Sequence, residues 1–163
     1  MPDERRRDLN FYRFRSEWRL RAPRDAVLEA LEDTARYSAW WPEIREVVAR
    51  GPAAQQMTAR SLLPYDLVFV TTQSRRDPEE GILEASMTGD LAGFSRWTIN
   101  GGSDASVAVF EEEVTAMKPL LRRLALVARP AFVANHRLMM RHGRAGLQTY
   151  LAGYVAGTRR DGP

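Results

Sequence analysis

The sequence predicts an α+β fold in which a seven-stranded, curved antiparallel sheet wraps around one long C-terminal helix, with two short helices after the first strand. Two observations support this prediction. Residues 43–117 consist of short segments of alternating hydrophobicity, separated by turn formers such as Gly51-Pro52 and Gly89-Asp90. After Pro119 the hydrophobic period changes to about 3.6 residues, and one apolar stripe runs from Phe132 to Tyr154.

The first three elements follow from the residues before Pro42. Phe11–Arg21 alternates between mostly apolar even-numbered positions and charged odd-numbered positions, which is typical of a strand with one buried face. Pro23–Asp33 has apolar residues at helical spacing and the acidic Asp25 in its first turn. Thr34–Trp41 predicts a second short helix, which ends at Pro42 because proline lacks the N–H that a continuing helix needs.

Six further strands and two further helices are expected in the rest of the chain. Sequential strands at this spacing indicate an antiparallel meander. The sheet must bury one face, and only the C-terminal helix is long enough to cover it, so a cavity forms wherever side chains leave the space between them unfilled. We expect a short helix at Leu120–Ala128, a break at Pro130 and the long helix over Pro130–Tyr154. The strands are expected at Ile44–Arg50, Gln56–Leu63, Tyr65–Ser74, Gly81–Thr88, Gly93–Asn100 and Ala105–Met117.

Length and composition indicate one domain without a metal or thiol site. A chain of 163 residues corresponds to a single domain, expected over residues 11–154 with tails at 1–10 and 155–163. The absence of cysteine excludes disulfides, zinc ribbons and thiol nucleophiles, and the two histidines are too few for a multi-histidine metal site. No phosphate-cradling loop or dinucleotide fingerprint is present. We therefore expect neither a metal nor a cofactor.

Charge and hydropathy predict a cytoplasmic protein that binds no nucleic acid. The 24 basic residues, of which 23 are arginine, are balanced by 21 acidic residues, and the net charge of +3 is small for a nucleic-acid binder. No stretch approaches about 18 consecutive apolar residues, so stable membrane insertion is not expected. Met1–Asp8 lacks the apolar core of a signal peptide. Either a monomer or a homodimer is compatible with these observations.

Four local strings, in their order and spacing, carry a family resemblance. They are Trp40-Trp41-Pro42, Gly89-Asp90-Leu91-Ala92-Gly93 followed by Arg96-Trp97, Lys118-Pro119-Leu120-Leu121, and Arg129-Pro130 leading to Asn135-His136, Met140 and Gly143. Together they resemble the START-like, Bet v 1-like superfamily known as SRPBCC, in particular its bacterial polyketide cyclase/dehydrase-like members. The resemblance covers roughly Phe11 to Leu151 and implies a helix-grip fold with a deep hydrophobic pocket. It implies no single reaction, because members include lipid carriers, hormone receptors and aromatases.

The acidic run Glu111-Glu112-Glu113 on the last strand contains a candidate for acid–base chemistry. Because neighbours in a strand point to opposite faces, either Glu112 or the other two carboxylates face the cavity. The apolar neighbours Phe110 and Val114 favour Glu112, as does the position that the resemblance implies. A carboxylate in an apolar pocket can act as general acid or base, or anchor a ligand hydroxyl or amine. The alternative is a glutamate that pairs with an arginine at the pocket mouth.

His136 lies on the inward stripe of the long helix and is the second candidate. A histidine facing the pocket can transfer protons near neutral pH. The alternative is a packing residue whose ring nitrogen is tied to a strand or a capping group. Asn135 is expected to point elsewhere, and His142, near Arg141 and Arg144, is expected to be solvated.

The alternation of side chains along the strands and the apolar stripe of the long helix predict which residues line the pocket. Large aromatic rings and adaptable methionines suit an apolar, planar ligand, although each residue alone is equally compatible with core packing. Gly143 leaves room either for a ligand or for close packing. Trp40-Trp41 either gate the entrance or fix the short helices to the sheet. The predicted ligand-binding set is Trp18, Trp41, Tyr65, Phe69, Met87, Trp97, Glu112, His136, Met139, Met140 and Gly143.

Three functions are compatible with these patterns. The first is a binding domain that holds a hydrophobic or aromatic small molecule between the sheet and the C-terminal helix. The second is an enzyme, a polyketide cyclase, aromatase or dehydratase, in which Glu112 and His136 act as acid and base. The third is a lipid-delivery or interaction module, which would expose an apolar rim around the pocket mouth.

Overall fold

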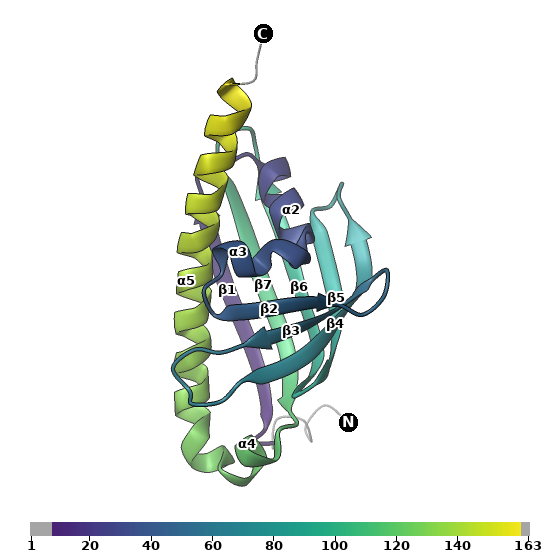
Figure 1. Ribbon diagram of the computed structural model, residues 1–163, viewed down its shortest axis with the longest axis vertical. Coiled ribbons are helices and arrows are strands. Elements are labelled where there is room, and N and C mark those ends of the chain that lie inside the picture. The colour runs from purple at the N-terminus through teal and green to yellow at the C-terminus, as the bar shows by residue number, and fades with distance from the viewer. Residues whose placement is uncertain (1–7, 161–163) are drawn as a thin grey trace.

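Seven antiparallel strands form one curved sheet that wraps around the long helix α5 (Figure 1). The computed structural model describes residues 8–160, with side chains placed for residues 8–154. The strand order is β1-β7-β6-β5-β4-β3-β2, so the chain from β2 to β7 is a meander and β1 joins its far edge beside β7. This is the predicted architecture. The strands are β1 Phe11–Leu20, β2 Ile44–Ala49, β3 Ala54–Ala59, β4 Leu67–Asp77, β5 Ile82–Gly89, β6 Leu91–Gly101 and β7 Ser106–Ala116.

The helices lie on one side of the sheet, and α5 runs along the length of the molecule (Figure 1). Of the helices in the described part of the chain, none is both long and apolar enough to cross a membrane. The first helical segments follow β1, as predicted. The helices are α2 Arg24–Glu32, the 3-10 turn η1 Thr34–Arg36, α3 Tyr37–Trp40, α4 Pro119–Arg123 and α5 Ala125–Arg160.

Helix boundaries near Pro130 differ from the prediction. The expected break at Pro130 is absent, because α5 begins at Ala125 and continues through the proline. At this position the proline removes one hydrogen bond close to the start of a long helix, which the remaining turns tolerate. The expected helix Leu120–Ala128 is instead divided at Leu124 into α4 and the first turn of α5.

Segment ends elsewhere also shift. β3 ends at Ala59 and β4 begins at Leu67, so residues 60–66 form a loop where strand ends were expected. The α5 backbone continues past Tyr154 to Arg160, into the segment expected as a C-terminal tail. The expected tail at residues 1–10 lies mostly outside the described residues, as do residues 161–163.

The inner faces of β1 and β7 follow the predicted alternation. Tyr12, Phe14, Trp18 and Leu20 are buried on β1, and every second residue from Ser106 to Ala116 is buried on β7. Because side chains alternate along a strand, the arginines of β1 occupy the opposite face of the sheet. This places Glu112 on the inner face, so the alternative with Glu111 and Glu113 inside is excluded.

The helical segment before β2 packs on α5 at two glycines. A Cβ on Gly146 would lie 1.8 Å from the Trp40 carbonyl oxygen, and one on Gly143 would lie 2.6 Å from Cε2 of Trp41. The Trp41 Nε1–H also donates a 2.9 Å hydrogen bond to the Met139 carbonyl. Both tryptophans are buried and fix the short helices, although these contacts are to α5 and not to the sheet as expected.

The glycine contact predicts a destabilising substitution with a matched control. Gly146→Ala should lower the free energy of unfolding by about 2 kcal/mol, because the new methyl group meets backbone that cannot rotate away. Gly153 lies on the same helix and has open space around it. Gly153→Ala should therefore raise the free energy of unfolding by up to about 1 kcal/mol, because alanine has the higher helix propensity. Urea unfolding of both variants measures the difference, and equal effects would contradict close packing at Gly146.

Candidate functional site

A cavity of about 310 Å³ lies between the inner face of the sheet, the short helices and α5. This volume is at the lower end of the range for small-molecule sites. Its walls come from all seven strands, β2 contributing Ile44, from the Leu31–Tyr37 region, and from Phe132 to Met140 on α5. The exposed lining residues Pro52, Ala53 and Gln73 mark where the cavity meets solvent. The space between sheet and helix is therefore not filled by side chains.

Most of the predicted lining residues are at the cavity. The residues found there are Trp41, Phe69, Met87, Trp97, Glu112, His136, Met139 and Met140.

The other three predicted residues, Trp18, Tyr65 and Gly143, do not line the cavity. Trp18 lies behind the wall, with its ring centroid 4.7 Å from that of Trp97, and it touches the helix near Gly143. Tyr65 lies in the 60–66 loop, where the Lys118 ammonium is 5.7 Å from its ring centroid. Gly143 is covered by Trp41, so of its two predicted roles the structure assigns close packing.

Glu112 and His136 meet at the cavity wall. The Glu112 Oε2 and His136 Nε2 atoms are 2.9 Å apart, and the two side chains are 7% and 14% exposed. The β-sheet register brings this about, since Glu112 lies between Phe14 of β1 and Ser95 of β6, on the face that α5 crosses. The two candidates of the sequence analysis are thus in direct contact.

The His136 ring is held by aromatic stacking as well as by the carboxylate. Its centroid is 3.7 Å from that of Phe14, with the rings 7° from parallel, and it lies 6.3 Å from the Phe110 centroid. A flat ring fixed on one face and at Nε2 cannot reorient freely.

Two atoms of this pair have no partner in the described part of the chain. Glu112 Oε1 and His136 Nδ1 make no hydrogen bond there, although both residues line the cavity. Glu112 Oε1 can accept a hydrogen bond, and His136 Nδ1 is a second ring nitrogen. Next to apolar walls, such atoms can orient a ligand hydroxyl or amine, or move a proton.

The charged residues that line the cavity are mostly acidic. Besides Glu112, its lining includes Glu32 and Glu84, which pair with Arg76 and Arg96 respectively. No arginine or lysine of the described residues lines the cavity, although the chain has 24 basic residues. The site therefore offers an anionic ligand no arginine or lysine as a counter-charge.

Among the polar residues at the cavity that were not predicted, Asn135 and Tyr37 are buried. Asn135, expected to point elsewhere, is buried at the cavity wall, and its Oδ1 accepts a 3.0 Å hydrogen bond from the Leu62 N–H. Tyr37 donates a 2.6 Å hydrogen bond to the Leu31 carbonyl, and burial raises the pKa of its phenol well above the ordinary value. Tyr37 is thus a neutral donor already in use. Asn135 belongs to the Asn135-His136 string of the resemblance, which is the one sequence signal that could have identified it, whereas nothing local in the sequence identifies Tyr37.

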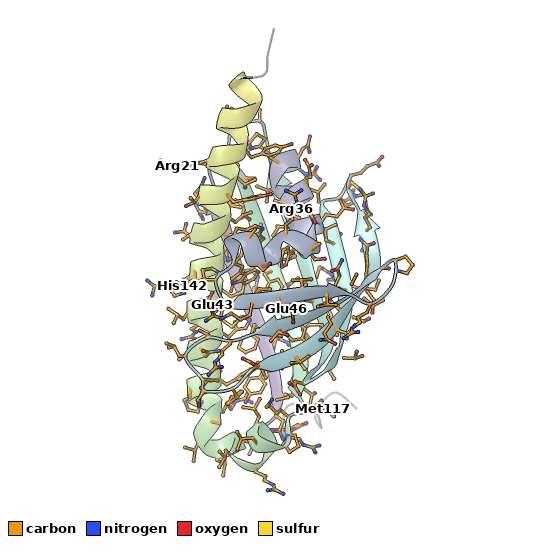
Figure 2. All side chains as sticks on the ribbon, viewed as in Figure 1. Arg21, Arg36, Glu43, Glu46, Met117 and His142 are labelled. Carbon is orange, nitrogen blue, oxygen red and sulfur yellow. The ribbon has the colours of Figure 1, made fainter. Side chains whose placement is uncertain are left out.

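His142 was expected to be solvated, but it pairs with a buried carboxylate. Its Nδ1 lies 2.5 Å from Oε1 of Glu43, which is buried, and Figure 2 shows the two residues side by side at the edge of α5. The half-exposed imidazole joins α5 to the segment after Trp41, away from the cavity.

Comparison with solved structures places this geometry in a known fold. No protein-family model and no curated protein matches the sequence. The Zhui aromatase/cyclase from Streptomyces sp. R1128 matches with a TM-score of 0.69 at 13% identity, covering 89% of this chain and 96% of that one. A START superfamily protein from Mycobacterium smegmatis matches with a TM-score of 0.70 at 16% identity, covering 87% and 98%.

A third match is the di-domain aromatase/cyclase BexL from the BE-7585A biosynthetic pathway, with a TM-score of 0.67 at 14% identity. It covers 90% of this chain and 52% of BexL. Identities this low establish shared architecture only, since one fold carries many functions. The chain therefore has the helix-grip fold of START-like proteins and aromatase/cyclases, as the sequence resemblance predicted.

Proposed function

We propose that the protein binds a small apolar or aromatic molecule in the cavity between the sheet and α5. The observation that carries this proposal is the open space of about 310 Å³, walled by Trp41, Phe69 and Trp97, with the Glu112–His136 pair at its side. Apolar walls with a few convergent polar atoms are the usual composition of small-molecule sites. The similar architecture of proteins described as aromatase/cyclases supports the same choice.

The charged residues of the lining favour a neutral or cationic ligand over an anionic one. An anion would enter beside Glu32, Glu84 and Glu112 without a lining arginine or lysine to offset its desolvation. A hydroxyl or a protonated amine can instead donate to Glu112 Oε1. We therefore expect aromatic alcohols and amines to bind better than carboxylates or sulfonates of the same shape.

A pair of matched dyes tests this expectation. N-phenyl-1-naphthylamine is neutral, and 1-anilinonaphthalene-8-sulfonate adds one sulfonate to the same rings. The neutral dye should bind at least about ten-fold more tightly in fluorescence titrations, because the sulfonate loses water without gaining a counter-charge. Tighter binding of the sulfonate at the same site would contradict the charge argument.

A cavity-filling substitution locates the site. Ala85 lines the cavity from β5, whereas Thr88 is exposed on the other face of that strand. Ala85→Phe should weaken binding of N-phenyl-1-naphthylamine by about ten-fold or more, since the added ring occupies the space of the ligand. Thr88→Phe should leave it unchanged. If both variants bind the dye like the unmodified protein, the ligand site lies elsewhere.

A second candidate function is acid–base catalysis on a bound poly-β-ketone, favoured by the 2.9 Å contact between Glu112 and His136. Glu112 would remove a proton from a carbon between two carbonyl groups, and the carbanion would attack another carbonyl carbon of the same chain. His136 would protonate the resulting oxyanion, and loss of water would complete the ring double bond. A proton passed across the contact restores both residues.

Neighbouring glutamates provide the matched test of catalysis. If the reaction occurs, Glu112→Gln should slow formation of aromatic product from a short linear poly-β-ketone by about 100-fold or more, as expected for loss of a general base. Glu111→Gln, on the outer face of β7, should leave the rate unchanged. Absorbance of the aromatic product measures both. Unchanged turnover by Glu112→Gln would eliminate this candidate, leaving binding alone.

A further inference from the structure

Several large apolar side chains are exposed at and beside α4, which lies at one end of the molecule (Figure 1). Most of the exposed large hydrophobic residues belong to one eleven-residue segment, 117–127, whereas the cavity opens near Pro52 and Gln73. These residues therefore do not form the apolar rim that a lipid-delivery module would have around its pocket mouth, and they make a separate surface. This α4 patch consists of Met117 (43% exposed), Leu120 (47%), Leu124 (50%), Leu126 (78%) and Val127 (81%).

The same part of the sequence carries only positive charge. Residues 114–160 contain nine arginines and lysines and no aspartate or glutamate, whereas residues 1–113 contain 15 basic and 20 acidic residues. At the patch itself, Arg122 and Arg123 are exposed and make no ion pair with any described residue. Lys118 contributes less, because its ammonium lies 3.5 Å from the Asp90 carboxylate.

We propose that the α4 patch docks the protein on an anionic lipid bilayer. Aliphatic side chains that protrude from a helical turn can enter the boundary between headgroups and acyl chains, while adjacent arginines pair with anionic headgroups. Each arginine held near an anionic leaflet strengthens partitioning by about five-fold. The association is peripheral, because none of the described helices is apolar enough to span a membrane. This proposal is independent of what the cavity binds.

Other occupants fit the patch less well. A symmetric contact with a second copy would bring Arg122 and Arg123 of both chains together, which opposes association. Nucleic acid offers phosphates for the arginines, but exposed Leu126 and Val127 would gain nothing from them, and the patch has no aromatic ring on which a base could stack.

Co-sedimentation with vesicles tests the proposal with the whole protein. The probes are vesicles of phosphatidylcholine alone and of phosphatidylcholine mixed with phosphatidylserine, each at low and high salt. Three variants are compared with the unmodified chain: Leu126→Ser/Val127→Ser, Arg122→Glu/Arg123→Glu and Arg21→Glu/Arg36→Glu. The last pair has the same charge change, and Figure 2 shows both Arg21 and Arg36 well away from Met117, toward the other half of the molecule. Thermal unfolding checks that each variant remains folded.

We expect binding to the phosphatidylserine vesicles that weakens with salt and is at least about ten-fold weaker for each patch variant. The Arg21→Glu/Arg36→Glu variant should bind as the unmodified chain does. Three results would overturn the proposal: no binding to these vesicles, equal loss in the control variant, or no loss on Leu126→Ser/Val127→Ser. A concentration-dependent dimer in solution that Leu126→Ser/Val127→Ser abolishes would also overturn the proposal, because a second copy would then cover the patch.

Discussion

The position of the Trp41 indole determines where α5 lies relative to the sheet, and the cavity depends on that position. The ring contacts α5 at Gly143, donates from Nε1 to the Met139 carbonyl and forms part of the cavity wall. One turn further along, the Trp40 backbone takes the space that a side chain at residue 146 would need. The helix is therefore held close at these glycines, while the larger side chains from Phe132 to Met140 face the open space.

This arrangement also fixes the polar pair. His136 is two turns before Gly143 on α5, and Glu112 is near the middle of β7, so their contact depends on the distance between helix and sheet. Stacking of the imidazole on Phe14 limits the remaining freedom of the ring. Separating a buried carboxylate from its hydrogen-bond partner is costly, because the group left behind would be desolvated and unpaired. The pair is thus both a structural contact between α5 and β7 and the only acid–base pair at the cavity among the described residues.

Periodicity in the sequence was sufficient to predict the order of elements and the inner faces of β1 and β7. The alternation of Tyr12 to Leu20 with arginines and the apolar stripe on α5 are direct consequences of burial on one side. Helix ends near Pro130 could not be predicted, because local propensity does not show that neighbouring turns compensate for one missing hydrogen bond. Glu112 was identified from its position in the strand and from the resemblance, and His136 from its position on the apolar stripe of the helix. The orientation of Asn135 and the pairing of His142 with Glu43 depend on residues distant in sequence, which no local pattern encodes.

The central claim, that a small molecule occupies the space between sheet and helix, is tested most directly by crystallography of the protein purified from its own cells without added ligand. The account predicts electron density in the cavity for a neutral or cationic molecule within hydrogen-bonding distance of Glu112 Oε1 or His136 Nδ1. Native mass spectrometry of the same sample would give the mass of that molecule. A structure in which α5 lies closer to the sheet and side chains fill the space would contradict the account.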